Sequence, residues 1–317
     1  MLNGWFAAAA AFGISAVLGP VIIPVLRRLK MRQTERTEGV QSHLKKAGTP
    51  TMGGLIFLIG ATVSTIIFGW NYPKVWPVMI LMLGFGAIGF FDDYLKVVLK
   101  RSDGLLAWQK LILQFGVTLI FALVLIFGTD VSLAIRIPFA GGLMVDIGFL
   151  AIPLLFIVVL ATVNGVNFTD GLDGLASTVT LIVAFCFAGS SIGMSAGISP
   201  VCCAVAGGLM GFLLYNAYPA KVFMGDTGSL ALGGFVAGAA YMMNMPLYIL
   251  IIGIIYAVEL VSVVLQVGYF KLTHGKRIFK MTPIHHHFEL CGWSETRIVA
   301  VFSIITAILC LLVYTGI

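Results

Sequence analysis

Aspartates beside lysines are the residues of this chain best suited to chemistry. Asp92 and Asp93 are followed at helical spacing by Lys96 and Lys100. Neighbouring residues of a helix point about 100° apart, so the two aspartates face different ways, whereas Asp92 and the two lysines fall on one face. A carboxylate next to two lysines predicts a phosphate site. The alternative is an exposed ion pair at a helix end, which contributes little to stability.

A second polar segment, residues 164–175, carries an amide or a carboxylate at every third position. Its members are Asn164, Asn167, Asp170 and Asp173, interleaved with Gly165, Gly171, Leu172 and Gly174. Such a loop lets the backbone approach a ligand closely and leads into a helix N-terminus, where anions bind. A calcium loop would need a twelve-residue pattern closing on Glu, which this segment lacks. A capped turn would explain only one Asp and one Gly.

The third segment, residues 216–229, runs from Asn216 to the predicted start of another helix, where Asp226 and Ser229 lie. Their oxygens are suited to a phosphate bound at that N-terminus, and Phe223 offers a ring on which a base could stack. Considered alone, however, Asp226 is interpreted as the N-cap of the helix.

Three consecutive histidines, His285, His286 and His287, form the last polar segment. In an extended stretch, His285 and His287 would share one side. A partly protonated histidine that faces a phosphate is the favoured interpretation at such a basic surface. A zinc site completed by Glu289 or Cys291 is the alternative.

The elements that must position these residues are transmembrane helices. Of the 317 residues, 60% are hydrophobic and only 10% charged, too few charges to coat a soluble protein. About 20 apolar residues in a helix span a bilayer. The continuous apolar runs predict ten such helices, at residues 3–26, 51–70, 75–95, 108–128, 147–166, 174–194, 200–217, 228–244, 247–270 and 297–316. The sequence therefore predicts an all-α, polytopic membrane protein with a single domain, residues 1–317.

Basic residues set the predicted orientation. Of the 19 Lys and Arg residues, 17 fall in or beside the loops after the first, third, seventh and ninth helices, and only Lys74 and Arg136 fall on the other side. By the positive-inside rule those loops face the cytoplasm and both termini face out. The net charge of +6 thus reflects topology and attraction to an anionic bilayer surface. It does not indicate nucleic-acid binding, because no stripe of basic and aromatic residues accompanies it.

The predicted cytoplasmic face collects the aspartates of all three Asp-bearing segments. This placement favours phosphoryl transfer assisted by Mg²⁺, which usually takes one or two carboxylates together with water and substrate phosphates. Glu259 is the exception, because it lies inside a predicted span and away from the cluster. It keeps an ion or solute transporter open as an alternative. A non-catalytic lipid-binding scaffold would not need several convergent aspartates.

Five segments together resemble the bacterial phospho-N-acetylmuramoyl-pentapeptide transferases, within the polyprenyl-phosphate N-acetylhexosamine-1-phosphate transferase superfamily. They are Gly48-Thr-Pro-Thr-Met-Gly-Gly54, Asp92-Asp93, residues 164–175, Phe223-Met-Gly-Asp-Thr-Gly-Ser229 and Pro283-Ile-His-His-His-Phe-Glu289. The resemblance runs nearly end to end. The first and last segments narrow it to the muramoyl-pentapeptide branch, and a sister transferase with a UDP-GlcNAc donor is the nearest alternative.

The resemblance implies an enzyme of the bacterial inner membrane, often a homodimer, with its active site facing the cytoplasm. Such an enzyme uses Mg²⁺ to transfer phospho-MurNAc-pentapeptide from UDP-MurNAc-pentapeptide to undecaprenyl phosphate, forming lipid I and UMP. The resemblance makes Asp226 the metal ligand, and it makes Asp92 and Asp93 the pair that handles the lipid phosphate, with one of them a candidate base.

The resemblance also assigns the substrate contacts. A nucleoside pocket is implied at Asn167, Asp170, Gly171, Leu172, Asp173, Asn216 and Phe223. Phosphate and other substrate contacts are implied at Lys46, Lys96, Lys100 and His285, with His285 a further catalytic candidate. The same polar segments add Asn164, Ser229, His286 and His287 as candidates for substrate binding.

Overall fold

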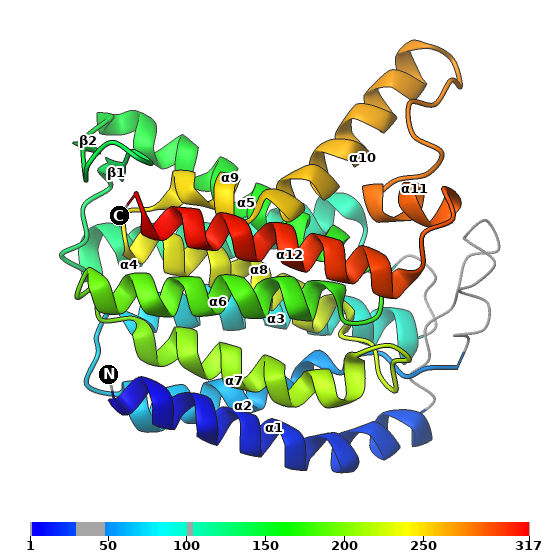
Figure 1. Cartoon of the computed structure of the whole chain (residues 1–317), viewed down its shortest axis with the longest axis horizontal. Helices are drawn as coiled ribbons and strands as arrows, with labels where there is room; N and C mark the ends of the chain where they lie inside the picture. The colour runs from blue at the N-terminus through cyan, green and yellow to red at the C-terminus, as the bar shows by residue number, and fades with distance from the viewer. Residues whose placement is uncertain (1, 30–47, 100–103, 317) are drawn as a thin grey trace.

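The computed structural model describes residues 2–29, 48–99 and 104–316 of the chain. In this part, each of the ten predicted spans contains a helix. These helices are α1 (Leu2–Arg28), α2 (Gly54–Gly69), α3 (Val75–Val97), α4 (Ala107–Gly128), α5 (Ala151–Thr169), α6 (Leu175–Gly193), α7 (Ser199–Asn216), α8 (Gly225–Met242), α10 (Ile254–Leu272) and α12 (Glu295–Tyr314). Most of them run side by side in one bundle, and α10 leans out of it (Figure 1).

Short elements connect the long helices. They are the antiparallel pair β1 (Ile135–Arg136) and β2 (Met144–Val145), the 3₁₀ turns η2 (Gly148–Leu150) and η3 (Pro246–Tyr248), α9 (Ile249–Ile252) and α11 (Ile284–Leu290). The first and last parts of the described chain lie at the same end of the bundle (Figure 1), as an even number of crossings requires.

Eight of the described helices are long and apolar enough to cross a membrane, which confirms the prediction of an all-α polytopic membrane protein. Two of the ten predicted spans fall outside this group. α2 has only 16 residues, and α8 begins with the polar residues Asp226, Thr227 and Ser229. The total of ten crossings stays a prediction.

The polar start of α8 is tolerated because α8 is the central helix, and protein covers it on all sides. Every residue of α8 from Thr227 to Met242 is buried. Glycines let the neighbouring backbones come very close, as small residues do in membrane helix packing. Gly89 of α3 lies so near the backbone of Asp226 that a Cβ at this position would overlap the Asp226 carbonyl. This close contact fixes the position of α3 along α8 at the level of Asp92, Asp93 and Asp226.

The segment 50–54 ties the α7–α8 loop to the start of α2. The amide of Phe223 donates to the carbonyl of Pro50 over 2.8 Å, and the amide of Gly53 donates back to the carbonyl of Phe223 over 2.8 Å. The amide of Gly54 donates to the carbonyl of Met224 over 2.9 Å. This pairing fixes the chain immediately before Asp226.

Candidate active site

Asp226 is the centre of the polar cluster. The interpretation of Asp226 as an N-cap is wrong, because α8 begins at Gly225 and Met224 occupies the cap position without a side-chain hydrogen bond. The carboxylate is therefore free to turn toward other helices. Its Oδ2 atom lies 3.0 Å from both Lys96 Nζ and Lys110 Nζ, and its Oδ1 atom accepts from Asn167 Nδ2 over 2.8 Å.

Asp92 lies beside the same two lysines. Its Oδ2 atom is 2.7 Å from Lys96 Nζ and 3.6 Å from Lys110 Nζ, and its Oδ1 atom accepts from the amide of Leu105 over 2.7 Å. The side chain of Asp92 is only 2% exposed, whereas that of Lys96 is 39% exposed. The prediction that Asp92 and Lys96 lie on one face of the helix is therefore confirmed. The contact is not an isolated surface ion pair, because it belongs to a network of two carboxylates and two ammonium groups.

Asp93 faces α8, away from the lysines. Its Oδ2 atom accepts from the amide of Thr227 over 2.9 Å and from Thr227 Oγ1 over 2.6 Å, and its Oδ1 atom accepts from the amide of Asp226 over 3.2 Å. The prediction that the adjacent aspartates face different ways is confirmed. Asp93 satisfies free amides in the first turn of α8 and so helps to hold Asp226 in place.

Amide side chains of α5 connect the cluster to its neighbours. Asn167 Nδ2 donates to Asp226 Oδ1 and also lies 2.8 Å from Ser229 Oγ, which in turn donates to the carbonyl of Gly225. Asn164 lies deeper and exchanges hydrogen bonds with Gln114 of α4. Asn167 and Ser229 thus belong to the Asp226 cluster, and Asn164 links α5 to α4.

The loop between α5 and α6 presents some of its predicted residues to the site and buries others. Asp170 is half-buried at the C-cap of α5. Desolvation, followed by the nearby carboxylates of Asp226, Asp93 and Asp173, raises the pKa of Asp170 well above its ordinary value. Asp173 accepts from the amide of Ala220 over 2.9 Å, and Leu172 is buried in the apolar core.

Asn216 and Phe223 lie in the segment between α7 and α8. Asn216 is buried, and its amide group accepts from Ser177 Oγ over 2.7 Å and donates to the carbonyl of Val222 over 3.1 Å. The oxygen and the nitrogen of this side chain are thus both occupied by hydrogen bonds that hold the loop in place. Phe223 is partly exposed beside it.

The three histidines lie on the short helix α11 and not in an extended stretch, the arrangement in which His285 and His287 would share one side. His285 is buried, and its Nδ1 atom lies 3.0 Å from Glu259 Oε1. Nδ1 of His286 lies 2.7 Å from Glu289 Oε2, and Nδ1 of His287 accepts from the amide of Lys280.

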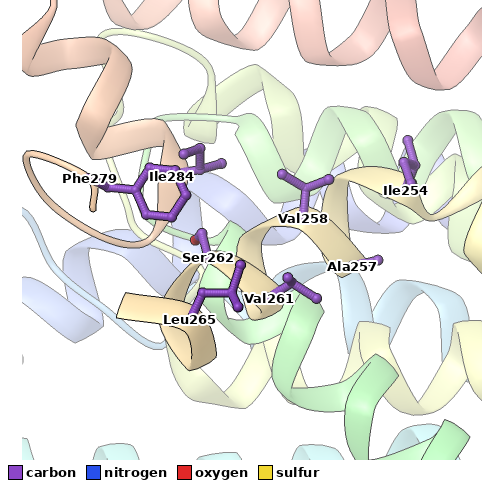
Figure 2. A pocket seen from close by; sticks show the side chains of 8 residues that line it. All are labelled: Ile254, Ala257, Val258, Val261, Ser262, Leu265, Phe279 and Ile284. Carbon is purple, nitrogen blue, oxygen red and sulfur yellow. The ribbon is translucent and has the colours of Figure 1, made fainter. Parts of the chain in front are cut away.

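The sequence suggested that Glu259 lies apart from the candidate site residues. The structure instead places it in contact with one of them, His285. α10 carries it to the buried face of α11, and the partner of its carboxylate is a histidine of the site. The outer face of α10 differs in character. It forms an apolar groove of about 310 Å³ without a charged side chain (Figure 2). The residues that line it are Ile254, Ala257, Val258, Val261, Ser262, Leu265, Phe279 and Ile284. In a bilayer, hydrocarbon would fill this groove.

The donor atoms of the cluster fit Mg²⁺ better than zinc. In residues 2–29, 48–99 and 104–316 no group of three or more His, Cys, Asp and Glu side chains is arranged to hold a metal ion, as a zinc site would require. Asp226 instead offers one partly exposed carboxylate, with the hydroxyl oxygen of Ser229 nearby and the amide nitrogen of Asn167 donating to both side chains. Mg²⁺ is commonly bound in this way, by one or two carboxylates, water and substrate phosphates.

Sequence reasoning missed three residues of the site. Lys110 contacts Asp226, Thr227 holds Asp93, and Gln114 pairs with Asn164. Lys110 and Gln114, one turn apart on the mostly apolar α4, were the available signal, since polar groups inside a span are usually functional. The candidates Lys46 and Lys100 lie outside the described residues.

Comparisons with known proteins agree along almost the whole chain. The family model described as Glycosyl transferase family 4 matches residues 75–244, and the phospho-N-acetylmuramoyl-pentapeptide-transferase signature 1 matches residues 46–58. The chain is 51% identical over 307 residues to the phospho-N-acetylmuramoyl-pentapeptide-transferase of Clostridium botulinum strain Alaska E43, with 95% of this chain and 92% of the relative covered.

Two further relatives carry the same name. The protein of Acetivibrio thermocellus is 51% identical over 306 residues, with 95% and 92% of the two chains covered. That of Clostridium perfringens strain 13 is 47% identical over 310 residues, with 96% of each chain covered. The matched region contains every described residue of the polar cluster.

Proposed function

The chain belongs to the phospho-N-acetylmuramoyl-pentapeptide-transferase family, and from this premise we propose that the cluster around Asp226 is its active site. The reaction moves phospho-MurNAc-pentapeptide from UDP-MurNAc-pentapeptide to undecaprenyl phosphate and yields lipid I and UMP, a step of peptidoglycan synthesis. The observation that supports this site most strongly is the contact of Lys96 and Lys110 with one oxygen of Asp226. The two ammonium groups can bind substrate phosphates, and the carboxylate between them can bind a cation.

The chemistry asks for positioning and charge neutralisation. An oxygen of the lipid phosphate attacks the sugar-linked phosphorus of the donor, the bond from that phosphorus to the oxygen of UMP breaks, and UMP leaves with the electron pair. Lys96 and Lys110 stabilise the negative charge on the phosphates. Mg²⁺ held by Asp226, with Asn167 and Ser229 beside it, would supply further neutralisation at the leaving phosphate.

Asp92 is better placed than Asp93 to receive a proton from the lipid phosphate. Asp93 already accepts three hydrogen bonds from the first turn of α8, and its proposed role is to hold Asp226. Asp92 Oδ2 instead lies among the ammonium groups of Lys96 and Lys110, where a phosphate would bind. Any proton on that phosphate would move to Asp92 as the attack begins.

The membrane supplies one substrate and the cytoplasm the other. The aspartate cluster lies at the end of the bundle whose loops carry most of the Lys and Arg residues, which supports a site facing the cytoplasm. A water-soluble nucleotide and a membrane lipid can meet at such a boundary. We further propose that residues 1–317 form one transferase domain in the bacterial inner membrane. The family resemblance supports a homodimer.

Release of UMP from purified protein tests this function. Protein in detergent or nanodiscs receives UDP-MurNAc-pentapeptide, undecaprenyl phosphate and Mg²⁺, and UDP-GlcNAc replaces the donor in a parallel reaction. UMP should appear only with the muramoyl donor and only with the lipid acceptor. Turnover of UDP-GlcNAc alone would favour a sister transferase, and no turnover of the muramoyl donor by folded protein would contradict the assignment.

A further inference from the structure

Glu259 and His285 form a buried pair that the reaction described above does not use. Glu259 is 0% exposed and His285 1% exposed, and they face each other from α10 and α11. Only one atom of each side chain is bonded in this contact, Oε1 of Glu259 and Nδ1 of His285. In the part of the chain that the structure describes, Glu259 Oε2 and His285 Nε2 have no hydrogen-bond partner.

Such unpartnered atoms are rare in folded proteins. Buried polar groups almost always have a hydrogen-bond partner, because leaving one unpaired sacrifices its contact with water. Two side chains that only pack α10 against α11 would not need a carboxylate and an imidazole. A ligand that supplies the missing partner explains why the pair exists.

The unpaired nitrogen of His285 points toward the loop between α5 and α6. Nε2 lies so close to Gly171 that a Cβ there would overlap the ring. Gly171 is the middle of the run from Asp170 to Leu172, which leads from α5 toward the helix N-terminus of α6. Only glycine leaves room for the His285 ring at position 171, so the ring packs directly against the backbone of the loop.

Glu259 determines which nitrogen of His285 is available. The contact with Glu259 occupies Nδ1 of His285. Nε2 is then the ring nitrogen left for a ligand, and the ring cannot turn away without breaking the bond to Glu259. A carboxylate behind a metal-binding or catalytic histidine acts in the same way.

We propose that Glu259 is a positioning residue, which holds His285 so that its Nε2 atom hydrogen-bonds the donor nucleotide at the loop of residues 170–173. The inference rests on the proposed function, together with the nucleoside pocket that the family resemblance implies at this loop. Glu259 itself touches no substrate and acts only through His285.

A double-mutant cycle tests this inference. The four proteins are the wild type, Glu259→Gln, His285→Asn and the double variant, and the KM of each substrate is measured from UMP release. Glu259→Gln should raise the KM of UDP-MurNAc-pentapeptide about tenfold and leave the KM of undecaprenyl phosphate unchanged, since only donor contacts are disturbed. In the His285→Asn background the same substitution should change the donor KM less than about twofold. If the tenfold change persists in that background, Glu259 does not act through His285 and the inference fails.

A control and a second variant distinguish a positioning role from a purely structural one. Ser262→Ala removes a buried hydroxyl on α10 that donates to the backbone carbonyl of Glu259, and it should leave both KM values unchanged. If Glu259→Gln lowers only the yield of folded protein, at normal KM values, the pair is merely a structural link between α10 and α11. If this variant does not fold, Glu259→Asp keeps the charge and shortens the reach, and it should show the same donor-selective increase.

The same double-mutant cycle can be measured without turnover, from the binding of UMP to each of the four proteins by calorimetry in the absence of the lipid acceptor. Glu259→Gln should weaken UMP binding in the wild-type background and have no further effect beside His285→Asn. Failure of turnover with this binding pattern intact would overturn the proposed reaction and leave the positioning role standing. Normal turnover with equal UMP binding in all four proteins would overturn the positioning role alone.

Discussion

Lys110 and Asp226 are separated by 116 residues, yet Lys110 Nζ lies 3.0 Å from Asp226 Oδ2. The first turn of α4 and the first turn of α8 therefore meet at one end of the bundle. Lys96 of α3 joins them at the same oxygen. Side chains of α3, α4 and α8 thus meet at Asp226 Oδ2, an oxygen of the proposed metal ligand.

Replacement of Lys110 should lower activity without loss of the fold. Lys110→Met removes one of two positive charges beside Asp226 but keeps an unbranched apolar stem, so kcat/KM for UMP release should fall about 100-fold. Lys74→Met is the matched control, since Lys74 lies at the opposite end of α3. A Lys110→Met enzyme with nearly normal kcat/KM would exclude this lysine from phosphate binding.

Replacement of Thr227 tests whether Asp93 acts by holding α8. Thr227→Val removes the hydroxyl that donates to Asp93 over 2.6 Å and leaves the shape of the side chain. We expect a loss of about 1 kcal/mol in the free energy of unfolding, together with about a tenfold loss in kcat, because the first turn of α8 carries Asp226. Thr227→Ser should restore both quantities. Equal activity of the Val and Ser variants would show that the hydroxyl is not needed.

The close approach of α3 and α8 predicts a steric effect at Gly89. A methyl group there would overlap the Asp226 carbonyl, so Gly89→Ala should destabilise the protein by about 1–3 kcal/mol and displace Asp226. Gly116→Ala in α4 is the control, because its Cβ would meet open space and alanine favours a helix. Thermal unfolding and UMP release of the two variants should differ clearly. A stable, active Gly89→Ala protein would contradict the packing described.

A native cysteine allows the proposed orientation to be tested. Cys291 is exposed just after α11, while Cys186, Cys202, Cys203 and Cys310 are buried. A membrane-impermeant thiol reagent should label Cys291 in inside-out vesicles and leave it unlabelled in right-side-out vesicles. Asp130→Cys in a Cys291→Ser background should show the reverse pattern, since Asp130 lies beyond the other end of α4. The opposite result for either cysteine would invert the topology.

The spans and the aspartates could be predicted because each depends on local sequence. A run of about 20 apolar residues must be helical in lipid, and Asp92 and Asp93 diverge because adjacent helical positions do. The N-cap interpretation of Asp226 failed by a shift of two residues. Helix boundaries are the least certain part of a sequence-based prediction, and here the cap position fell on Met224.

Contacts between distant helices could not be predicted from one sequence. Lys110 was interpreted only as a topology signal, since nothing local shows that α4 packs beside α3 and α8. Glu259 looked isolated for the same reason, because its partner His285 follows 26 residues later in a separate short helix. The short helix α11 that carries the histidines was not predicted, although Pro283, which occupies its N-cap position, was visible in the sequence.

The most direct test of the proposed active site is the activity of Asp226→Asn. The substitution keeps the size of the side chain and its contact with Asn167, but it removes the charge proposed to bind Mg²⁺. Asp130→Asn, at the far end of the bundle, serves as the control. Folded Asp226→Asn protein should release UMP at least about 1,000-fold more slowly than the wild type at every Mg²⁺ concentration, while Asp130→Asn stays active. Near-normal UMP release by Asp226→Asn at low Mg²⁺ would contradict the assignment of this cluster as the active site.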